Sequence, residues 1–347
     1  MKNTSILKTL LVLGIGLFLV SITGCDRVQD AILTEQTSTT KPIQPRVSMV
    51  YPFACLGDQS YCDLLSDGIK RAEVALGIDI DEVESSPETW DTDLRGAAEK
   101  SDLILTAGYQ MGEPIQRVAP KFPDVSFAII DSAVDLPNVA SFIYNINEGS
   151  FLVGAIAALK TETGKVGYIG GADVPLLHEF EAGYMAGVHA VNPDVEVFRE
   201  YIAEGPEGFD QPMVAENIAT RQYESGVDII YAAAAGAGHG VIEAAKALQK
   251  YVIWVDTNIN ATAPDIFLTS MLRQVNNAVY NIITQFAEGN FTPGVHRLGL
   301  KADDIVYALD EHNRPHFSDE ILMAVEMLKA RIISGEIVVP TEPVLPR

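Results

Sequence analysis

The chain has 347 residues, which is enough for one large or two medium domains with ample cores. Hydrophobic residues make up 48% of the chain and charged residues 20%, a balance that excludes disorder as its main state. The formal net charge is −23, from 47 Asp and Glu against 24 Lys and Arg. So negative a surface repels phosphate backbones, and we therefore expect no binding to nucleic acid.

The first 24 residues are typical of a secretory signal, with two lysines near the start and an apolar run over residues 10–22. That run is shorter than the roughly 20 residues that span a bilayer. The string Ile22-Thr23-Gly24-Cys25 resembles a bacterial lipobox, which predicts removal of the signal and acylation of Cys25, with palmitate for example. We expect a protein anchored to the cell membrane by lipid and facing the periplasm or the exterior. The alternatives are an ordinary signal or a single-span anchor, in which Cys25 has no special role.

Residues 25–45 are polar and rich in Thr and Gln, and they lack sustained apolar periodicity. This composition predicts a flexible tether rather than a domain. The folded part is therefore expected to begin near Arg46.

The rest of the chain alternates short β-rich apolar runs with amphipathic stretches of helical spacing. The candidate strands are residues 47–53, 78–83, 103–107, 125–130, 166–169, 195–202, 227–231, 252–255, 267–271 and 305–308. Such alternation predicts an α/β protein whose parallel sheets are covered by helices on both faces. Because the pattern restarts near Val166 after a helix-like segment, it favours two open sheets over one closed barrel.

Ligands of open α/β sheets bind beyond the carboxyl ends of the strands, where the loops converge. Six loops are therefore candidates for a binding site: residues 54–61, 108–113, 131–135, 170–177, 232–240 and 256–260. They carry aromatic and acidic side chains but almost no basic ones. This chemistry suits a neutral, polar ligand that is planar or bears hydroxyl groups, and it does not suit a free anion.

Two kinds of side chain in these loops are singled out as ligand-binding candidates. Tyr61 follows the first strand and can stack on a flat ring, while Asp58 either contacts the ligand or caps the helix that follows. Asp131 and Asp256 each end an apolar strand, and a carboxylate there can accept hydrogen bonds from adjacent hydroxyls such as the 2′,3′ pair of a ribose. The alternative for these two aspartates is a cap or a turn.

A glycine-rich turn follows Tyr231 and includes Gly236 and Gly238. Its backbone can approach a ligand closely, so both glycines are further candidates, and Tyr231 is a candidate through its aromatic ring. The GxGxxG spacing of a dinucleotide site is missing, and we expect no cofactor.

Cys55 and Cys62 flank the first candidate loop. Outside the cytoplasm they can form a disulfide that stiffens the loop, and the alternative is a pair of reduced thiols. The sequence contains no HExxH, GxSxG or Walker A string, and its six histidines are scattered. We therefore expect no catalytic residues, no metal site and no enzymatic activity.

Four longer strings resemble the basic membrane protein family of substrate-binding lipoproteins, of the purine-nucleoside-receptor type. They are residues 127–131 (FAIID), 149–154 (GSFLVG), 164–171 (GKVGYIGG) and 180–187 (FEAGYMAG). The resemblance implies a type I periplasmic-binding-protein architecture, in which two Rossmann-like lobes are joined by a three-segment hinge. It places residues 46–143 and about 267–300 in the N-terminal lobe, and residues 144–266 and about 301–347 in the C-terminal lobe.

The same resemblance implies a monomeric receptor that captures a nucleoside, of the purine type, and passes it to an ABC permease. By position, Tyr61 matches the stacking aromatic of the first lobe and Asp58 the acidic residue before it. Asp131 and Asp256 match the strand-terminal aspartates, and Arg273 aligns with a lysine of the family. The second stacking ring is not fixed by position, and its candidates are Tyr231, Phe209 and Phe180.

Four positions depart from the residues usual in the family: Gly57, Cys62, Trp254 and Asn276. These departures leave open a sugar, a riboflavin-like ring system or another small polar molecule as the ligand. Another class of function also stays open, that of a surface adhesin or signalling lipoprotein. A nucleoside-processing enzyme has the least support, because no acid–base or nucleophilic set is visible.

Overall fold

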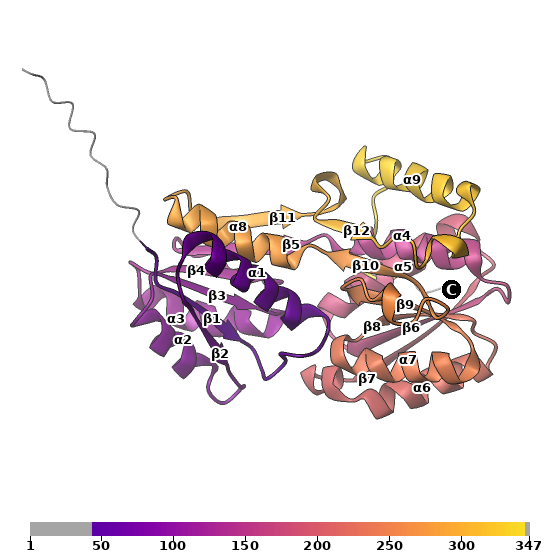
Figure 1. Ribbon diagram of the computed structural model, residues 1–347, viewed down its shortest axis with the longest axis horizontal. Coiled ribbons are helices and arrows are strands. Elements are labelled where there is room, and N and C mark those ends of the chain that lie inside the picture. The colour runs from indigo at the N-terminus through magenta and orange to yellow at the C-terminus, as the bar shows by residue number, and fades with distance from the viewer. Residues whose placement is uncertain (1–43, 344–347) are drawn as a thin grey trace, which may run out of the picture. The chain divides into compact units, whose positions relative to one another are not determined.

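The computed structural model describes residues 44–343, so the predicted signal peptide, Cys25 and nearly all of the predicted tether lie outside the described residues. The described chain contains two six-stranded sheets, each covered by helices (Figure 1). The first sheet contains β1 (Val47–Tyr51), β2 (Ile80–Glu84), β3 (Leu103–Ala107), β4 (Ser126–Ile130), β5 (Val139–Tyr144) and β11 (Gly294–Leu298). The second contains β6 (Lys165–Ala172), β7 (Glu196–Ala203), β8 (Ile229–Ala233), β9 (Tyr251–Asp256), β10 (Phe267–Arg273) and β12 (Ile305–Tyr307).

The strand order is β2-β1-β3-β4-β5-β11 in the first sheet and β7-β6-β8-β9-β10-β12 in the second. The paired strands run parallel, except that β12 is antiparallel to β10. Strands of a parallel sheet are buried on both faces and therefore form continuous apolar runs, as in the fully buried LILTA of β3. The predicted α/β class with two Rossmann-like lobes is confirmed.

Helices cover both faces of each sheet. Those of the first lobe are α1 (Tyr61–Leu76), α2 (Trp90–Ala98), α3 (Gly112–Val118) and α8 (Val275–Ala287). Those of the second lobe are α4 (Ile146–Lys160), α5 (Pro175–Val191), α6 (Pro212–Glu224), α7 (Gly238–Leu248) and α9 (Asp319–Ile333). They pack in pairs, α1 on α8 and α2 on α3 in the first lobe, and α4 on α5 and α6 on α7 in the second. None of the helices within residues 44–343 is long and apolar enough to cross a bilayer.

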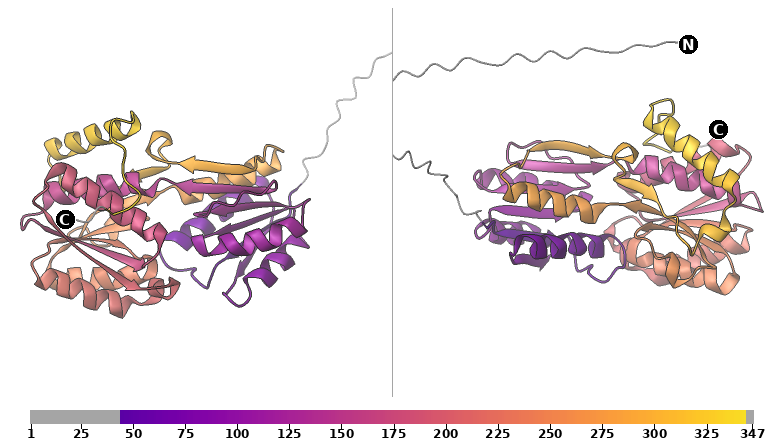
Figure 2. Two further views of the ribbon diagram at one scale, coloured as in Figure 1. Left: turned by 180° about the vertical axis from the view of Figure 1, so that it is seen from behind. Right: turned by 45° about the horizontal axis from the view of Figure 1, so that its top comes forward.

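The chain passes between the sheets three times: from β5 into α4, from β10 into α8, and from β11 towards β12 (Figure 2). These crossings are hydrogen-bonded to their neighbours. The Asn145 amide donates to the carbonyl of Leu298 at 2.7 Å, and the Gln274 amide donates to that of Asp304 at 2.8 Å. This arrangement is the predicted three-segment hinge.

The predicted boundary near residue 267 needs correction, because β10 belongs to the second sheet. It pairs with β9 from Phe267 opposite Val252 to Leu272 opposite Asp256. The run that we expected to return the chain to the first lobe is instead the fifth parallel strand of the second sheet. The return comes after Arg273, with α8 and β11.

Helices α4 and α5 pack with their backbones in contact at three glycines. A Cβ atom built on Gly187 would lie 1.9 Å from the carbonyl oxygen of Phe151, and one on Gly183 would lie 2.1 Å from that of Asn147. On α4, a Cβ atom at Gly154 would lie 2.2 Å from the carbonyl oxygen of Tyr184. These glycines fall in two of the strings that carry the family resemblance, so those strings encode a helix–helix contact.

Candidate functional site

A cavity of about 630 Å³ lies between the lobes, at the carboxyl ends of strands from both sheets. This volume falls within the roughly 300–1,000 Å³ of small-molecule sites. Each of the six predicted loops contributes at least one lining residue. A further wall comes from the short 3-10 helix η3 (Pro206–Asp210) of the second lobe.

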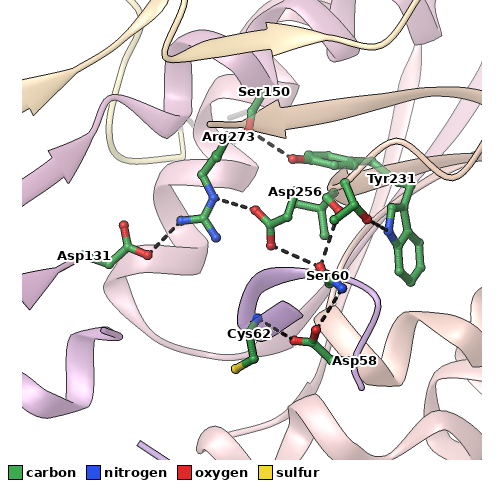
Figure 3. Close-up of polar contacts among 11 residues, drawn as sticks. Asp58, Ser60, Cys62, Asp131, Ser150, Tyr231, Asp256 and Arg273 are labelled. Atoms are coloured by element: carbon green, nitrogen blue, oxygen red, sulfur yellow. Dashed lines mark hydrogen bonds and ion pairs between the residues drawn. The ribbon is translucent and has the colours of Figure 1, made fainter. Parts of the chain in front are cut away.

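Among the residues that line the cavity, Arg273 joins two aspartates from different lobes (Figure 3). Its Nη1 lies 2.8 Å from Asp131 Oδ2, at the end of β4, and its Nε lies 2.5 Å from Asp256 Oδ1, at the end of β9. All three residues are buried, with at most 8% of their surface exposed. Burial lowers the pKa of Arg273, but the two carboxylates outweigh it and raise that pKa well above its ordinary value. The guanidinium therefore stays charged at any working pH.

Both aspartates adopt a backbone conformation that is uncommon for residues with a side chain. The φ angle is +65° at Asp131 and +67° at Asp256, in the left-handed region. Asp and Asn tolerate this region better than most residues, and such conformations cluster at functional sites. The two aspartates are thus turned out of their strands towards the same guanidinium.

Aromatic rings surround the guanidinium of Arg273. Its central carbon lies 4.7 Å from the ring centre of Tyr61, 5.6 Å from that of Phe180 and 5.9 Å from that of Tyr144. Burial and the charge of Asp131 raise the pKa of the Tyr61 hydroxyl well above its ordinary value, so the hydroxyl stays protonated. The ring of Tyr61 lines the cavity, and the guanidinium of Arg273 lies close enough to this ring for a cation–π interaction.

Asp58 lines the cavity, but its carboxylate is held by the start of α1. It accepts hydrogen bonds from the backbone amides of Ser60 at 2.8 Å, Cys62 at 3.0 Å and Asp63 at 3.2 Å. Burial raises the pKa of Asp58 and these amides lower it, with burial the larger effect. The geometry therefore shows the helix cap that was one of the two alternatives for this residue.

Two of the sequence candidates lie away from the cavity, Tyr231 and Gly238. Strand β8 continues to Ala233, so Tyr231 sits below the strand tip, with its ring centre 5.3 Å from that of Tyr184 and its hydroxyl 3.4 Å from Ser150. Gly238 lies under Trp254, where an added Cβ atom would come within 2.6 Å of the indole ring. Gly236, in the same turn, does line the cavity.

The second lobe presents two aromatic rings to the cavity, Phe180 from α5 and Phe209 from η3. The ring of Phe209 rests on Gly171, where a Cβ atom would lie 2.4 Å from it. With Tyr231 displaced, these are the remaining candidates for a second stacking ring.

Sequence reasoning missed Tyr109 and Gln110, which follow β3 and line the cavity. The Tyr109 hydroxyl and Gln110 Oε1 are buried and have no hydrogen-bond partner among the described residues. Gly108, with φ +95°, turns the chain there. A signal for both residues was present in the sequence. They follow a glycine at the end of a strand, in a loop that we already expected at the binding site. Phe53, Trp90, Glu207, Asp210 and His239 also line the cavity and were not singled out.

Cys55 and Cys62 are joined by a disulfide, the first of the two alternatives. The bridge ties the loop after β1 to the first turn of α1. Within residues 44–343, no group of three or more His, Cys, Asp or Glu side chains is arranged to hold a metal ion.

Comparisons with known proteins agree with this architecture. Residues 44–342 match the family model described as ABC transporter substrate-binding protein PnrA-like. The chain is 34% identical to the CD4+ T-cell-stimulating antigen of Listeria monocytogenes, over 86% of this chain and 88% of that one. It is 31% identical to basic membrane protein A of Borreliella burgdorferi, again over 86% and 88%. Among solved structures, an ABC transporter solute-binding protein from Aeropyrum pernix superposes with a TM-score of 0.77 at 29% identity, covering 85% of this chain and 94% of that one.

Proposed function

Because the chain belongs to the Bmp family of PnrA-like ABC transporter substrate-binding proteins, we propose that it captures a nucleoside, of the purine type, between its lobes. As in that family, the bound molecule is handed to an ABC permease. We further propose that the mature protein is held at the membrane by lipid on Cys25 and acts without catalysis.

One observation carries the choice of ligand: rings from both lobes and hydroxyl-accepting carboxylates line the same cavity. The first lobe supplies Tyr61, and the second supplies Phe180 and Phe209. Stacking on an aromatic ring contributes about 1–3 kcal/mol per base. A base held between the lobes would direct its ribose towards Asp131 and Asp256.

The aspartates keep room for ligand hydroxyls although Arg273 binds both. Asp131 meets Arg273 through Oδ2, which leaves Oδ1 for a ligand. A carboxylate oxygen accepts more than one hydrogen bond, so Asp256 Oδ2 can also take a hydroxyl in addition to its present donor. Arg273 orients both groups by fixing one oxygen of each.

The charge of the lining argues against phosphorylated ligands. Five carboxylates line the cavity, those of Asp58, Asp131, Glu207, Asp210 and Asp256, and Arg273 is already engaged by two of them. A phosphate entering here would meet like charge without a free guanidinium. Nucleosides should bind, and their monophosphates should not.

Isothermal titration tests this proposal with the chain from residue 26 onwards, after unfolding and refolding to remove any bound ligand. We expect heat on adding inosine, guanosine or adenosine, less with cytidine, and none with inosine 5′-monophosphate. Mass spectrometry of the molecule released on unfolding provides an independent check. A sugar or a flavin in that fraction, with no heat from any nucleoside, would overturn the ligand and leave the binding-protein role intact.

A further inference from the structure

The disulfide-closed loop of residues 55–62 is fixed by carboxylates of its own lobe. Glu84 Oε1 accepts from the amides of Cys55 at 3.0 Å and Leu56 at 3.3 Å. Asp63 accepts from the amides of Gly57 at 2.7 Å and Gln59 at 2.9 Å. Asp58 accepts from the amides of Ser60 and Cys62. Most of the loop's backbone donors are therefore bound within the first lobe.

This loop also reaches across the cleft to the end of β9. The Thr257 hydroxyl donates to the carbonyl oxygen of Gln59 at 2.6 Å. The Ser60 hydroxyl lies 3.2 Å from Asp256 Oδ2 and 3.4 Å from the carbonyl oxygen of Val255 (Figure 3). The Thr257 hydroxyl in turn accepts from the indole N–H of Trp254 at 3.2 Å, which fixes its orientation.

We propose that Gln59, Ser60 and Thr257 form an interlobe clasp that sets how long the closed protein retains its ligand. The ligand would contact residues that line the cavity, whereas the clasp joins the two lobes directly. Its hydrogen bonds exist only when the lobes are closed, so they act on ligand release and not on ligand encounter. This inference deepens the proposed binding function, on which it rests.

The clasp and the buried ion pairs share one carboxylate. Asp256 Oδ1 binds Arg273, while Oδ2 faces the Ser60 hydroxyl. Arg273 also binds Asp131 of the first lobe, so two contacts between the lobes converge on Asp256. Closing the clasp therefore also orients an aspartate that we place at the ribose.

The disulfide has a defined part in the clasp. Gln59 adopts a φ of +52°, in the left-handed region that is uncommon for a residue with a side chain. The bridge between Cys55 and Cys62 closes the loop around this position and keeps the Gln59 carbonyl pointing at Thr257. Without the bridge, the loop would have to be ordered each time the lobes close.

The central test is Thr257→Val, which removes the hydroxyl and keeps the branched shape. We expect inosine to dissociate about 2- to 10-fold faster, the effect of losing the one Thr257 hydrogen bond that joins the lobes, with an association rate unchanged within about 2-fold. The variant also loses the hydrogen bond from the Trp254 indole, which lies within the second lobe. Thr257→Ser should restore the wild-type dissociation rate. Thr262→Val is the matched control, because Thr262 donates to Ile259 within its own turn and is exposed. Stopped-flow tryptophan fluorescence measures both rates, and equal dissociation rates for Thr257→Val and Thr262→Val would overturn the clasp.

A double-mutant cycle tests the part of the disulfide. In the variant with Cys55→Ser and Cys62→Ser, the loop no longer holds Gln59 in place, so Thr257→Val should then speed dissociation less than it does in the disulfide-bonded protein. If the two effects multiply fully, the disulfide does not act through the clasp.

Small-angle X-ray scattering separates failure of the clasp from failure of the ligand. Without ligand, Thr257→Val should have a larger radius of gyration than Thr257→Ser, because its closed form is less populated. If no nucleoside binds but this difference is found, the clasp stands and the ligand is wrong. If no nucleoside binds and the two variants scatter alike, the clasp is overturned as well.

Discussion

Arg273 forms buried ion pairs with one aspartate from each lobe. It ends β10 of the second sheet, yet one of its two carboxylate partners, Asp131, belongs to the first. Buried ion pairs add little to stability by themselves, but removing one partner leaves an uncompensated charge behind. Removing Arg273 should therefore destabilise the protein more than forming its ion pairs stabilises it.

Replacing Arg273 by methionine should lower the free energy of unfolding by about 3–5 kcal/mol, because Asp131 and Asp256 would then face each other in a buried space. No cation would then lie between the two carboxylates, and their like charges would repel each other. Urea unfolding of the wild type and the variant at pH 7 measures the loss.

The wild-type protein is the reference for that experiment, since its guanidinium binds both carboxylates. An unfolding free energy of Arg273→Met within about 0.5 kcal/mol of the wild-type value would show that the two aspartates do not repel each other once the arginine is gone.

At the scale of elements, the family strings on α4 and α5 specify a close crossing of two helices. Gly154, Gly183 and Gly187 leave no room for a methyl group at this contact. Their small size, rather than their flexibility, is what the packing requires. This explains why two strings in which only Phe180 lines the cavity still identify the fold.

Gly187→Ala should destabilise the protein by about 1–3 kcal/mol or more, because the added Cβ atom would lie 1.9 Å from a backbone oxygen that belongs to α4. Gly96→Ala is the matched control. Gly96 lies within α2 with nothing in reach of an added Cβ atom, so alanine there should stabilise by about 0.5–1 kcal/mol. The melting temperature, measured by circular dichroism, should fall for Gly187→Ala and rise for Gly96→Ala.

Sequence patterns predicted the strands that form long buried runs, such as β3 and β9, because parallel strands covered on both faces are apolar throughout. They missed β5 and β11, which lie together at one edge of the first sheet. The polar, partly exposed GVHRL of β11 has no such run, and only its pairing with β5 makes it a strand. Pairing between segments about 150 residues apart cannot be read from local composition.

The candidate site shows the same limit. Strand-terminal aspartates could be found because a carboxylate at the end of an apolar run is a local signal. Tyr231 was misplaced because the sequence does not fix where β8 ends, and two residues decide whether a side chain reaches the cleft or the core. The contact of Thr257 with Gln59 joins positions 198 residues apart, and no local pattern indicates it.

At the scale of the whole molecule, the full chain has a formal charge of −23, and most of its charged residues lie in two lobes that must close on each other. Like charges repel within the compact state, and added salt screens exposed charges beyond about 10 Å at 0.1 M. The charge thus opposes folding while it favours solubility.

Raising sodium chloride from about 10 mM to about 500 mM should therefore raise the melting temperature of the ligand-free protein, by about 2–4 °C for each kcal/mol of repulsion removed. Differential scanning calorimetry measures the shift. Choline chloride at the same ionic strength should act alike, because screening does not depend on the identity of the cation. An increase with sodium alone would point to specific ion binding instead.

The two sheets repeat one strand order, and Asp131 and Asp256 stand at the ends of corresponding strands, β4 and β9. The strands that come next in each sheet end differently, β5 in Tyr144 and β10 in Arg273. A molecule made of two identical halves could not hold this arrangement: two tyrosines would leave a pair of negative charges with no counterion, and two arginines would set cations against each other. The halves can resemble each other almost anywhere else, but at this one pair of positions they are obliged to differ.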